Sequence, residues 1–357
     1  MFRTTCLAAV IATTNAQALE LGKPITTSAV ITQPGKTAGT IKKQVVLMNL
    51  QLTPEEQQAF FNNAAKKTTS LKSNKGTPLP AALNLGMNNV PVLDQGLHGT
   101  CVTFANTAAL DAMLDMGDYI SQLCQLELGG SLQPESKGRV PSGWDGSFGP
   151  YVLNQIHLFG VVSKDVQKQQ FCAGVYDYPK DDPFSQGNPM TLSEFSSKRS
   201  RALTNQFYPV YLMNYTQRIH SDEMLAEKVL IKIKKALNQG DRSTIGMMIF
   251  LPENCSAGAC ASHKAKFDTW ALTKEIENNT SSPYGHEVIV TGYDDNAVAV
   301  DQNGKKHQGL LMLRNSWGEQ VGDHGNYYMS YDYFIKLALE AQIIAHTINS
   351  NKPEVTH

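Results

Sequence analysis

The sequence predicts an α+β fold, and two patterns of apolar residues indicate it. From Cys101 to Met116, apolar residues recur at intervals of three and four, the spacing of a helix with one buried face. Nearer the C-terminus, residues 288–290 and 310–313 are short apolar runs of the kind that forms β-strands. The chain therefore contains both helices and strands, as in an α+β protein.

The composition excludes several classes of protein. The 357 residues exceed one typical domain by a modest margin, so we expect one globular unit with additional segments. Charged residues make up 18% and the net charge is −1, which argues against a nucleic-acid partner or an anionic membrane surface. No apolar run reaches the roughly 18 residues of a membrane span. We also expect no cofactor, since no phosphate-binding glycine loop is present, and no bound metal.

Residues 1–18 have the pattern of a signal peptide. Arg3 gives a positive start, residues 6–12 form a short apolar core, and residues 16–18 (Ala-Gln-Ala) form a small-residue cleavage site. The alternative is a buried N-terminal helix, which the Thr-Thr-Asn sequence at 13–15 disfavours. We therefore expect a secreted or periplasmic protein, made for an oxidising environment.

Residues 19–78 differ in composition from the rest of the chain. Thr, Lys, Gln and Gly are frequent, and a strand is expected at Gln44–Leu50. A short helix begins after Thr53, with Pro54 at its first position and two glutamates in its first turn. A linker rich in Lys, Ser and Asn follows at 66–77. Such a segment cannot bury enough apolar surface to fold alone.

Cys101 is a candidate nucleophile because it opens a predicted helix, with Gly99 or Thr100 as the cap. The unpaired N–H groups and the dipole of a first helical turn favour negative charge, so a thiol placed there loses its proton more readily. The side-chain amide of Gln95 can turn toward the same place and supply an oxyanion site. The alternative is a buried structural cysteine.

A base and an orienting group occur in the C-terminal third. His286 follows Gly285 and precedes the predicted strand 288–290, and Asn315 follows the run 310–313. An imidazole beside a thiol can take its proton and pass it to a leaving amine. An amide oxygen on the other ring nitrogen fixes the tautomer. A single histidine at a strand start is usually structural, but Cys, His and Asn together favour nucleophilic catalysis.

These three segments resemble those of the papain-like cysteine peptidases: QGLHGTCVTFA, GHEVIVTGYD and LRNSWGEQVGDHG. The resemblance runs from about Leu79 to about Phe334. It implies a two-lobed fold, with the active site in a cleft between the lobes. A helical lobe would carry Cys101, and a β-rich lobe would carry His286 and Asn315.

The same resemblance implies a role for each candidate residue. Cys101 would be the nucleophile, His286 the base and Asn315 the orienting group. Gln95 and the Cys101 backbone N–H would form the oxyanion hole. Trp317 would shield the hydrogen bond between the histidine and the asparagine from water.

One weaker similarity extends the resemblance. The segment DGSFGPYVLNQIHLFGVV resembles the glycine-containing segment whose backbone pairs with substrate. Gly146 and Ser147 in this segment, and Gly285 in the histidine segment, are the candidate substrate-binding residues. The family usually has a cysteine three residues before the nucleophile and a tryptophan after it. This chain has His98 and Val102 there, so we expect no disulfide at that position and a loop role for His98.

A peptidase domain at 79–350 would contain two insertions. Residues 180–215 are expected to form a loop region with a short helix, and residues 252–283 to contain a helix at 267–276. The insertions lengthen the interval between Cys101 and His286 beyond the roughly 130–150 residues usual in the family.

Four cysteines remain once the signal peptide and the reactive thiol are set aside, and four is an even number. Cys255 and Cys260 bracket a flexible loop that can bring their sulfurs together, and Cys124 with Cys172 would form the other bridge. The alternative is a zinc-like cluster of Cys255, Cys260 and His263, which has no clear fourth ligand. An exported protein favours the disulfides.

The sequence thus predicts a secreted cysteine peptidase that hydrolyses protein or peptide substrates through a Cys101 acyl-enzyme. The resemblance implies that residues 19–78 are a propeptide that inhibits the enzyme intramolecularly until it is cut. The alternative for this segment is a permanent N-terminal extension. Two other functions stay open: an acyl-transfer or amidase enzyme on the same scaffold, and a non-catalytic binding homologue.

Overall fold

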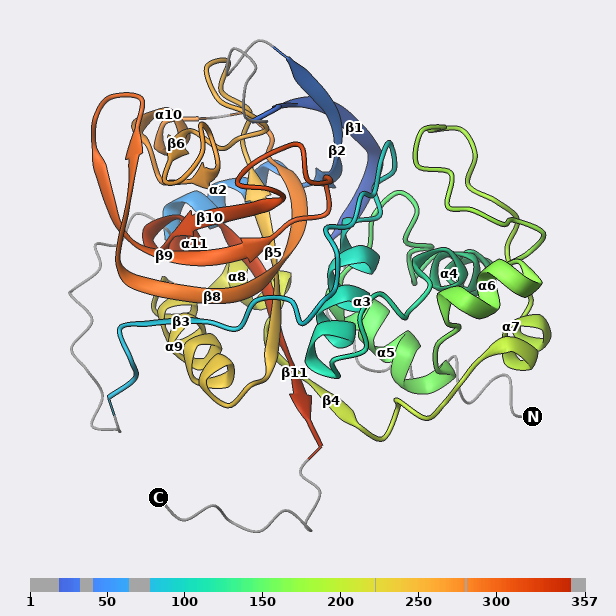
Figure 1. Cartoon of the computed structure of the whole chain (residues 1–357). Helices are drawn as coiled ribbons and strands as arrows, with labels where there is room; N and C mark the ends of the chain where they lie inside the picture. Colours follow the sequence, from blue (N-terminus) through green and yellow to red (C-terminus); the bar gives the residue numbers. More distant parts are fainter. Residues whose placement is uncertain (1–18, 33–40, 64–77, 222, 280, 348–357) are drawn as a thin grey trace, which may run out of the picture.

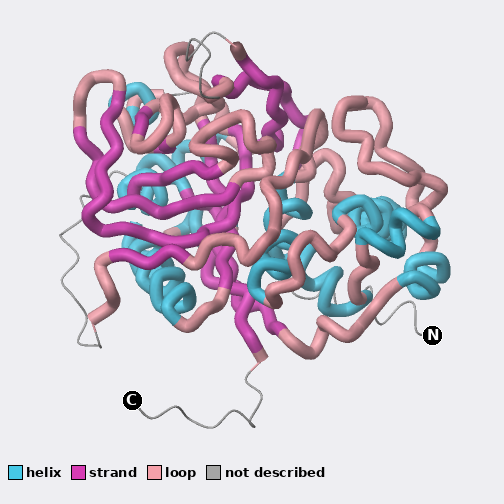
Figure 2. The backbone as a smooth tube through the Cα atoms, in the orientation of Figure 1, coloured by secondary structure: helices cyan, strands magenta, loops and turns pink. Residues whose placement is uncertain are grey.

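The structure is a computed structural model that describes residues 19–32, 41–63, 78–221, 223–279 and 281–347. The predicted signal peptide and the predicted linker at 66–77 lie outside these residues. The helices between residues 101 and 198 gather on one side of the molecule, and most strands lie on the other side together with the remaining helices (Figure 1; Figure 2). The predicted α+β fold with two lobes is confirmed.

The helical lobe is built around a helix with no exposed face. It contains α3 (Cys101–Met113), α4 (Gln122–Glu135), α5 (Gly149–Phe159), α6 (Lys164–Gln170) and α7 (Leu192–Lys198). Every residue of α3 is buried, because α4 and α5 contact one side of it and the sheet contacts the other. Hydroxyl side chains of Ser121, Ser163 and Thr191 cap α4, α6 and α7.

One sheet of eleven strands spans the described residues and carries the β-rich lobe. The strands that follow the N-terminal segment are β3 (Ala82–Asn84), β4 (Phe207–Met213), β5 (Arg242–Ile249), β6 (Ala261–Ser262), β7 (Thr269–Trp270), β8 (Tyr284–Asp301), β9 (Lys306–Arg314), β10 (Asn326–Ser330) and β11 (Ala338–His346). The order is β4-β11-β5-β8-β6-β7-β10-β9, and β9 pairs back with β8. Strands β8, β6, β7, β10 and β9 therefore form a closed circuit.

Four further helices accompany the sheet: α8 (Tyr215–His220), α9 (Glu223–Asn238), α10 (Lys274–Glu277) and α11 (Tyr331–Leu337). α9 and α11 pack against each other, and Leu230, Ile233 and Leu237 of α9 enter the main core. No helix of the described ranges is long and apolar enough to cross a membrane.

The N-terminal segment adds two strands and a helix to this framework: β1 (Glu20–Val30), β2 (Lys42–Gln51) and α2 (Pro54–Asn63). The strand and the helix predicted here are confirmed. Thr53 and Glu56 form a reciprocal cap, since each backbone N–H donates to the other's side chain. β1 pairs with β2, and β2 pairs with β8 (Figure 1).

This segment is folded because it packs against the rest of the chain. Leu19, Val45, Leu47, Leu50 and Phe60 are buried in the core of the β-rich lobe. Met48 belongs to a second cluster that joins the two lobes and includes Cys101. The segment buries its apolar residues against the β-rich lobe and at the junction between the lobes.

The two predicted insertions differ from expectation in one respect each. Residues 180–215 do contain a helix, α7, but they end in β4, which pairs with β11 and so belongs to the sheet. The helix predicted at 267–276 is wrong over its first half. Thr269 and Trp270 form β7, parallel to β10, and Trp270 is fully buried, so tertiary packing overrides the local helical pattern.

Both predicted disulfides are present, Cys124–Cys172 and Cys255–Cys260, and Cys101 is free. The zinc-like alternative does not hold, because the sulfurs of Cys255 and Cys260 are bonded to each other. The described part of the chain has no group of three or more His, Cys, Asp or Glu side chains that could hold a metal ion.

Candidate active site

Cys101 is the first residue of α3, at the junction of the two lobes. Thr100 occupies the N-cap position, but its hydroxyl is hydrogen-bonded to the Tyr178 hydroxyl at 2.8 Å and does not cap the helix. The first N–H groups of α3 therefore stay available to the thiol. The backbone N–H groups of Val102 and Glu287 favour the thiolate, which places the sulfur next to the residue that follows His286.

The thiol is neutral in this state, contrary to the expectation of a lowered pKa. Complete burial raises the pKa of Cys101 to about 12, because desolvation of a thiolate outweighs the stabilisation by nearby N–H groups. Burial likewise lowers the pKa of His286 to about 4. Both groups are uncharged near neutral pH, so the reactive thiolate–imidazolium pair is suppressed.

His286 lies in β8 and is hydrogen-bonded to Asn315, with 2.7 Å between Nε2 of the ring and Oδ1 of the amide. The pairing of β8 with β9 sets this contact, since Ile289 lies opposite Arg314, the residue before the asparagine. Nδ1 of the ring is buried without a hydrogen-bond partner. Nδ1 is therefore the ring nitrogen that is free to take up or release a proton.

Two tryptophans enclose this pair. The Trp317 ring stacks on the His286 ring, with centroids 4.4 Å apart and planes at 24°. Trp270, from the second insertion, lies 6.3 Å from the same imidazole. His286 and Asn315 are almost completely buried, which keeps water from competing for their hydrogen bond.

Gln95 is held by contacts on every side. Its N–H bonds the Ser316 carbonyl at 2.8 Å, and its side-chain Oε1 accepts a hydrogen bond from the Ser316 hydroxyl at 2.8 Å. Its own carbonyl accepts from the Tyr178 hydroxyl at 2.8 Å. The Nε2 group donates to the His98 carbonyl at 2.8 Å and to the Val46 carbonyl at 3.3 Å. No local pattern in the sequence indicates Ser316 or Tyr178 as part of the site.

Strand β2 crosses the site from one lobe to the other. The Val46 carbonyl takes the Gln95 amide hydrogen that an oxyanion would need. Two residues on, Met48 pairs with Gly285 and contacts Gly146. A Cβ atom on Gly146 or Gly285 would lie 3.2 Å or less from the Met48 side chain, so both glycines are needed for the close approach. Ser147, the third candidate substrate-binding residue, is buried.

Comparison with known proteins finds similar solved structures but no similar family model or curated sequence. Among solved structures, xylellain, a cysteine protease from Xylella fastidiosa, is 17% identical (80% of this chain, 95% of that chain, TM-score 0.47). Digestive procathepsin L 3 from Tenebrio molitor larval midgut is 19% identical, and the match covers 82% of this chain and 79% of that chain with a TM-score of 0.44. The proform of the ragweed pollen allergen Amb a 11, a cysteine protease, is 14% identical, and the match covers 76% of this chain and 67% of that chain with a TM-score of 0.45.

The Cys101 thiol, at the start of a central helix, lies beside the backbone N–H of Glu287, the residue after His286, and His286 is hydrogen-bonded to Asn315. The fold is similar to the folds of these cysteine proteases. In this fold the candidate residues Cys101, His286, Asn315 and Gln95 meet at the junction of the lobes, although they lie far apart in the sequence.

His98 has a structural role in this fold. Its ring is 2% exposed and packs edge-on against Trp144 and Tyr178, whose own rings stack 5.8 Å apart. Its Nε2 is hydrogen-bonded to the Pro179 carbonyl at 2.8 Å. An aromatic cluster thus holds the loop before Cys101 where the family usually has a disulfide.

Proposed function

We propose that this protein is an exported cysteine peptidase folded as an inactive precursor. The observation that carries the proposal is the meeting of Cys101, His286, Asn315 and Gln95 beneath a strand of the N-terminal segment. The two disulfides fit export to an oxidising compartment.

In the active form, Cys101 Sγ attacks the carbonyl carbon of a peptide bond and its proton passes to His286 Nδ1. The Gln95 amide and the Cys101 backbone N–H hold the negative oxygen of the tetrahedral intermediate. His286 then gives the proton to the leaving amine, and a thioester stays on the cysteine. Water attacks the thioester with His286 again as base, and the carboxylic acid leaves.

Asn315 and Trp317 act through the imidazole. The asparagine oxygen at Nε2 requires that nitrogen to carry a hydrogen, so Nδ1 is the basic position in the neutral ring. The stacked indole of Trp317 excludes water from this hydrogen bond.

The direction of β2 explains why it is not a substrate. By resemblance, the acyl part of a substrate lies beside Gly146, and the leaving amine must lie beside His286 and Trp317. A substrate therefore runs, N to C, from Gly146 toward Trp317. β2 runs the other way, from Lys43 beside Trp317 to Met48 beside Gly146. Its peptide groups face the thiol in reversed order and are not positioned for cleavage.

Latency also follows from burial. β2 fills the oxyanion site and excludes the water that would ionise the thiol and the imidazole. The segment stays in place because a tethered strand has a high effective concentration. Cutting the linker at 66–77 removes that advantage and allows the strand to leave.

The test compares the chain beginning at Leu19 before and after nicking at Lys66, Lys67, Lys72 or Lys75. We expect iodoacetamide labelling of Cys101 and peptide hydrolysis to rise together on nicking, with the Cys101→Ser chain as the inactive control. If the uncut chain is already as active as the nicked chain, residues 19–78 are a permanent extension. A nicked chain that hydrolyses simple amides but no peptide would indicate an amidase on this scaffold.

A further inference from the structure

Lys43 of β2 has an ion-pair partner beside the candidate active site. Its ammonium group lies 2.7 Å from Asp94 Oδ2 and donates to the Trp317 carbonyl at 2.8 Å. Both side chains are largely removed from water, with 20% and 28% of their surface exposed. Lys43 precedes Val46, whose carbonyl lies at Gln95, so the pair is three residues along the strand from the oxyanion site.

The Asp94 carboxylate is positioned by the protein and not by the lysine alone. Its Oδ1 accepts the Gly96 N–H at 3.1 Å, and its backbone forms a β-bridge with Trp317. Gly318 leaves the space that the ammonium occupies, since a Cβ atom there would lie 3.0 Å from Lys43 Nζ. Carboxylate, carbonyl and open space thus form a ready-made site for a cationic side chain.

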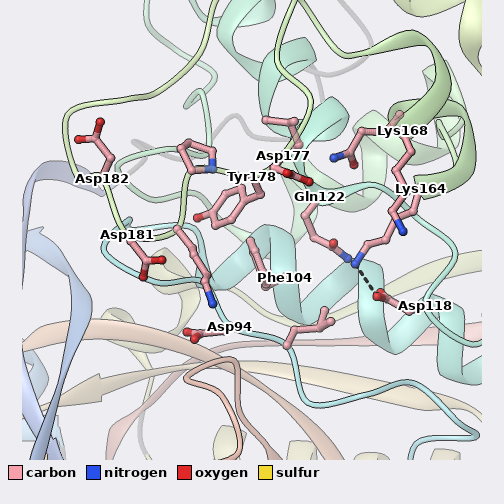
Figure 3. A pocket seen from close by; sticks show the side chains of 15 residues that line it. Asp94, Phe104, Asp118, Gln122, Lys164, Lys168, Asp177, Tyr178, Asp181 and Asp182 are labelled. Atoms are coloured by element: carbon pink, nitrogen blue, oxygen red, sulfur yellow. Dashed lines mark hydrogen bonds and ion pairs between the residues drawn. The ribbon is translucent and has the colours of Figure 1, made fainter.

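The surroundings of Asp94 are acidic. The carboxylate lines a cavity of about 720 Å³ whose wall also carries Asp181, Asp182 and Lys180. Figure 3 shows Asp94, Asp181 and Asp182 along one side of this cavity, with the Lys164–Asp118 ion pair on the other side. A basic side chain at Asp94 would therefore meet more negative than positive charge.

We infer that Asp94 binds a lysine or arginine on the leaving-group side of the scissile bond. The inference rests on the proposed function, because it takes β2 to occupy the substrate's place. Lys43 lies on the Trp317 side of Val46, and that is the side of the leaving amine. When β2 leaves, Asp94 loses its lysine, and a substrate that supplies a cation among the first residues after the cleaved bond replaces it.

The experiment uses the full chain nicked in the linker and two peptides that differ only by Lys or Gln after the cleaved bond. We expect kcat/KM to favour the Lys peptide by about two- to fivefold, as for a partly exposed charge pair. In Asp94→Asn the preference falls toward one, mainly through KM, because the contact binds the substrate in the ground state and the transition state alike.

Asp182→Asn is the matched control. It removes one negative charge from the same cavity wall, and its amide oxygen can still accept the Phe184 N–H that Asp182 accepts at 3.0 Å. The control should keep the preference. Equal rates for the two peptides, or an unchanged preference in Asp94→Asn, would overturn the inference and leave the peptidase intact. If no peptide is cleaved by the nicked chain, the proposed function fails, and the inference fails with it.

Discussion

The substitution Met48→Ala tests whether β2 keeps the Cys101 thiol unreactive. Met48 is 5% exposed and lies between Gly146 of one lobe and Gly285 of the other. Truncation of a buried methionine costs about 2–5 kcal/mol, and we expect about 2–3 kcal/mol here because the strand can settle toward the glycines. Since this side chain makes its contacts only while β2 is docked, the loss falls on the docked state.

The free energy lost by the docked state sets the expected increase in the alkylation rate of Cys101. Each 1.4 kcal/mol is a factor of about ten in an equilibrium constant, so the undocked fraction rises roughly 30- to 150-fold. Iodoacetamide reacts with Cys101 only in that fraction, because the thiol is completely buried and its pKa is raised to about 12 when β2 is docked. The labelling rate of the uncut Met48→Ala chain should therefore rise by the same factor.

The assay follows alkylation of the uncut chain by mass spectrometry under conditions where the fold stays intact by circular dichroism. Thr26→Ala is the control, since Thr26 lies on β1 opposite Val46, is exposed and faces away from the core. Its labelling rate should stay within about twofold of the parent chain. A Met48→Ala chain labelled no faster than the parent would refute the claim that β2 shields the thiol.

Three further predictions concern activity and pH. In the nicked enzyme, His286→Ala should abolish peptide hydrolysis measured as kcat/KM, while Asn315→Ala should leave more residual activity because it orients the ring and takes no proton. Burial lowers the pKa of His286 to about 4 from 6.5, so the folded chain binds fewer protons than the unfolded chain between these values. Stability should therefore fall as pH drops from about 6.5 to about 4, and the urea midpoint of His286→Gln should fall less. Burial and the neighbouring Glu287 carboxyl raise the pKa of Glu340, so its stability contribution is lost as pH rises through that pKa. Glu340→Gln should raise Tm more at pH 8 than at pH 4.

The residues that the sequence indicated are those with strong local signals. Cys101 at a helix start and His286 at a strand start each follow from a change of periodicity, and the structure brings both to the lobe junction. The two disulfides followed from an even number of cysteines and are confirmed. The helix cap at Thr53 is also confirmed, and it could be predicted because a cap depends only on a few neighbouring residues.

The features that were missed depend on contacts between distant segments. Nothing local to Tyr178 indicates that its hydroxyl will meet Gln95 and Thr100. The pKa of Cys101 was expected to be lowered by its helix, but burial under a strand some fifty residues earlier raises it. The helix predicted at 267–276 fails because Trp270 is required in the core as part of a strand. In each case tertiary packing outweighs the local preference.

The central claim, that Cys101 forms an acyl-enzyme with a peptide, can be tested by trapping the thioester. The nicked chain would be mixed with a slowly hydrolysed peptide ester, quenched in acid, digested and examined by mass spectrometry. We predict that the peptide containing Cys101 gains the mass of the acyl group, and that Gln95→Ala and His286→Ala chains gain far less. An unmodified Cys101 peptide during turnover, or an acyl group attached to another residue, would contradict the account.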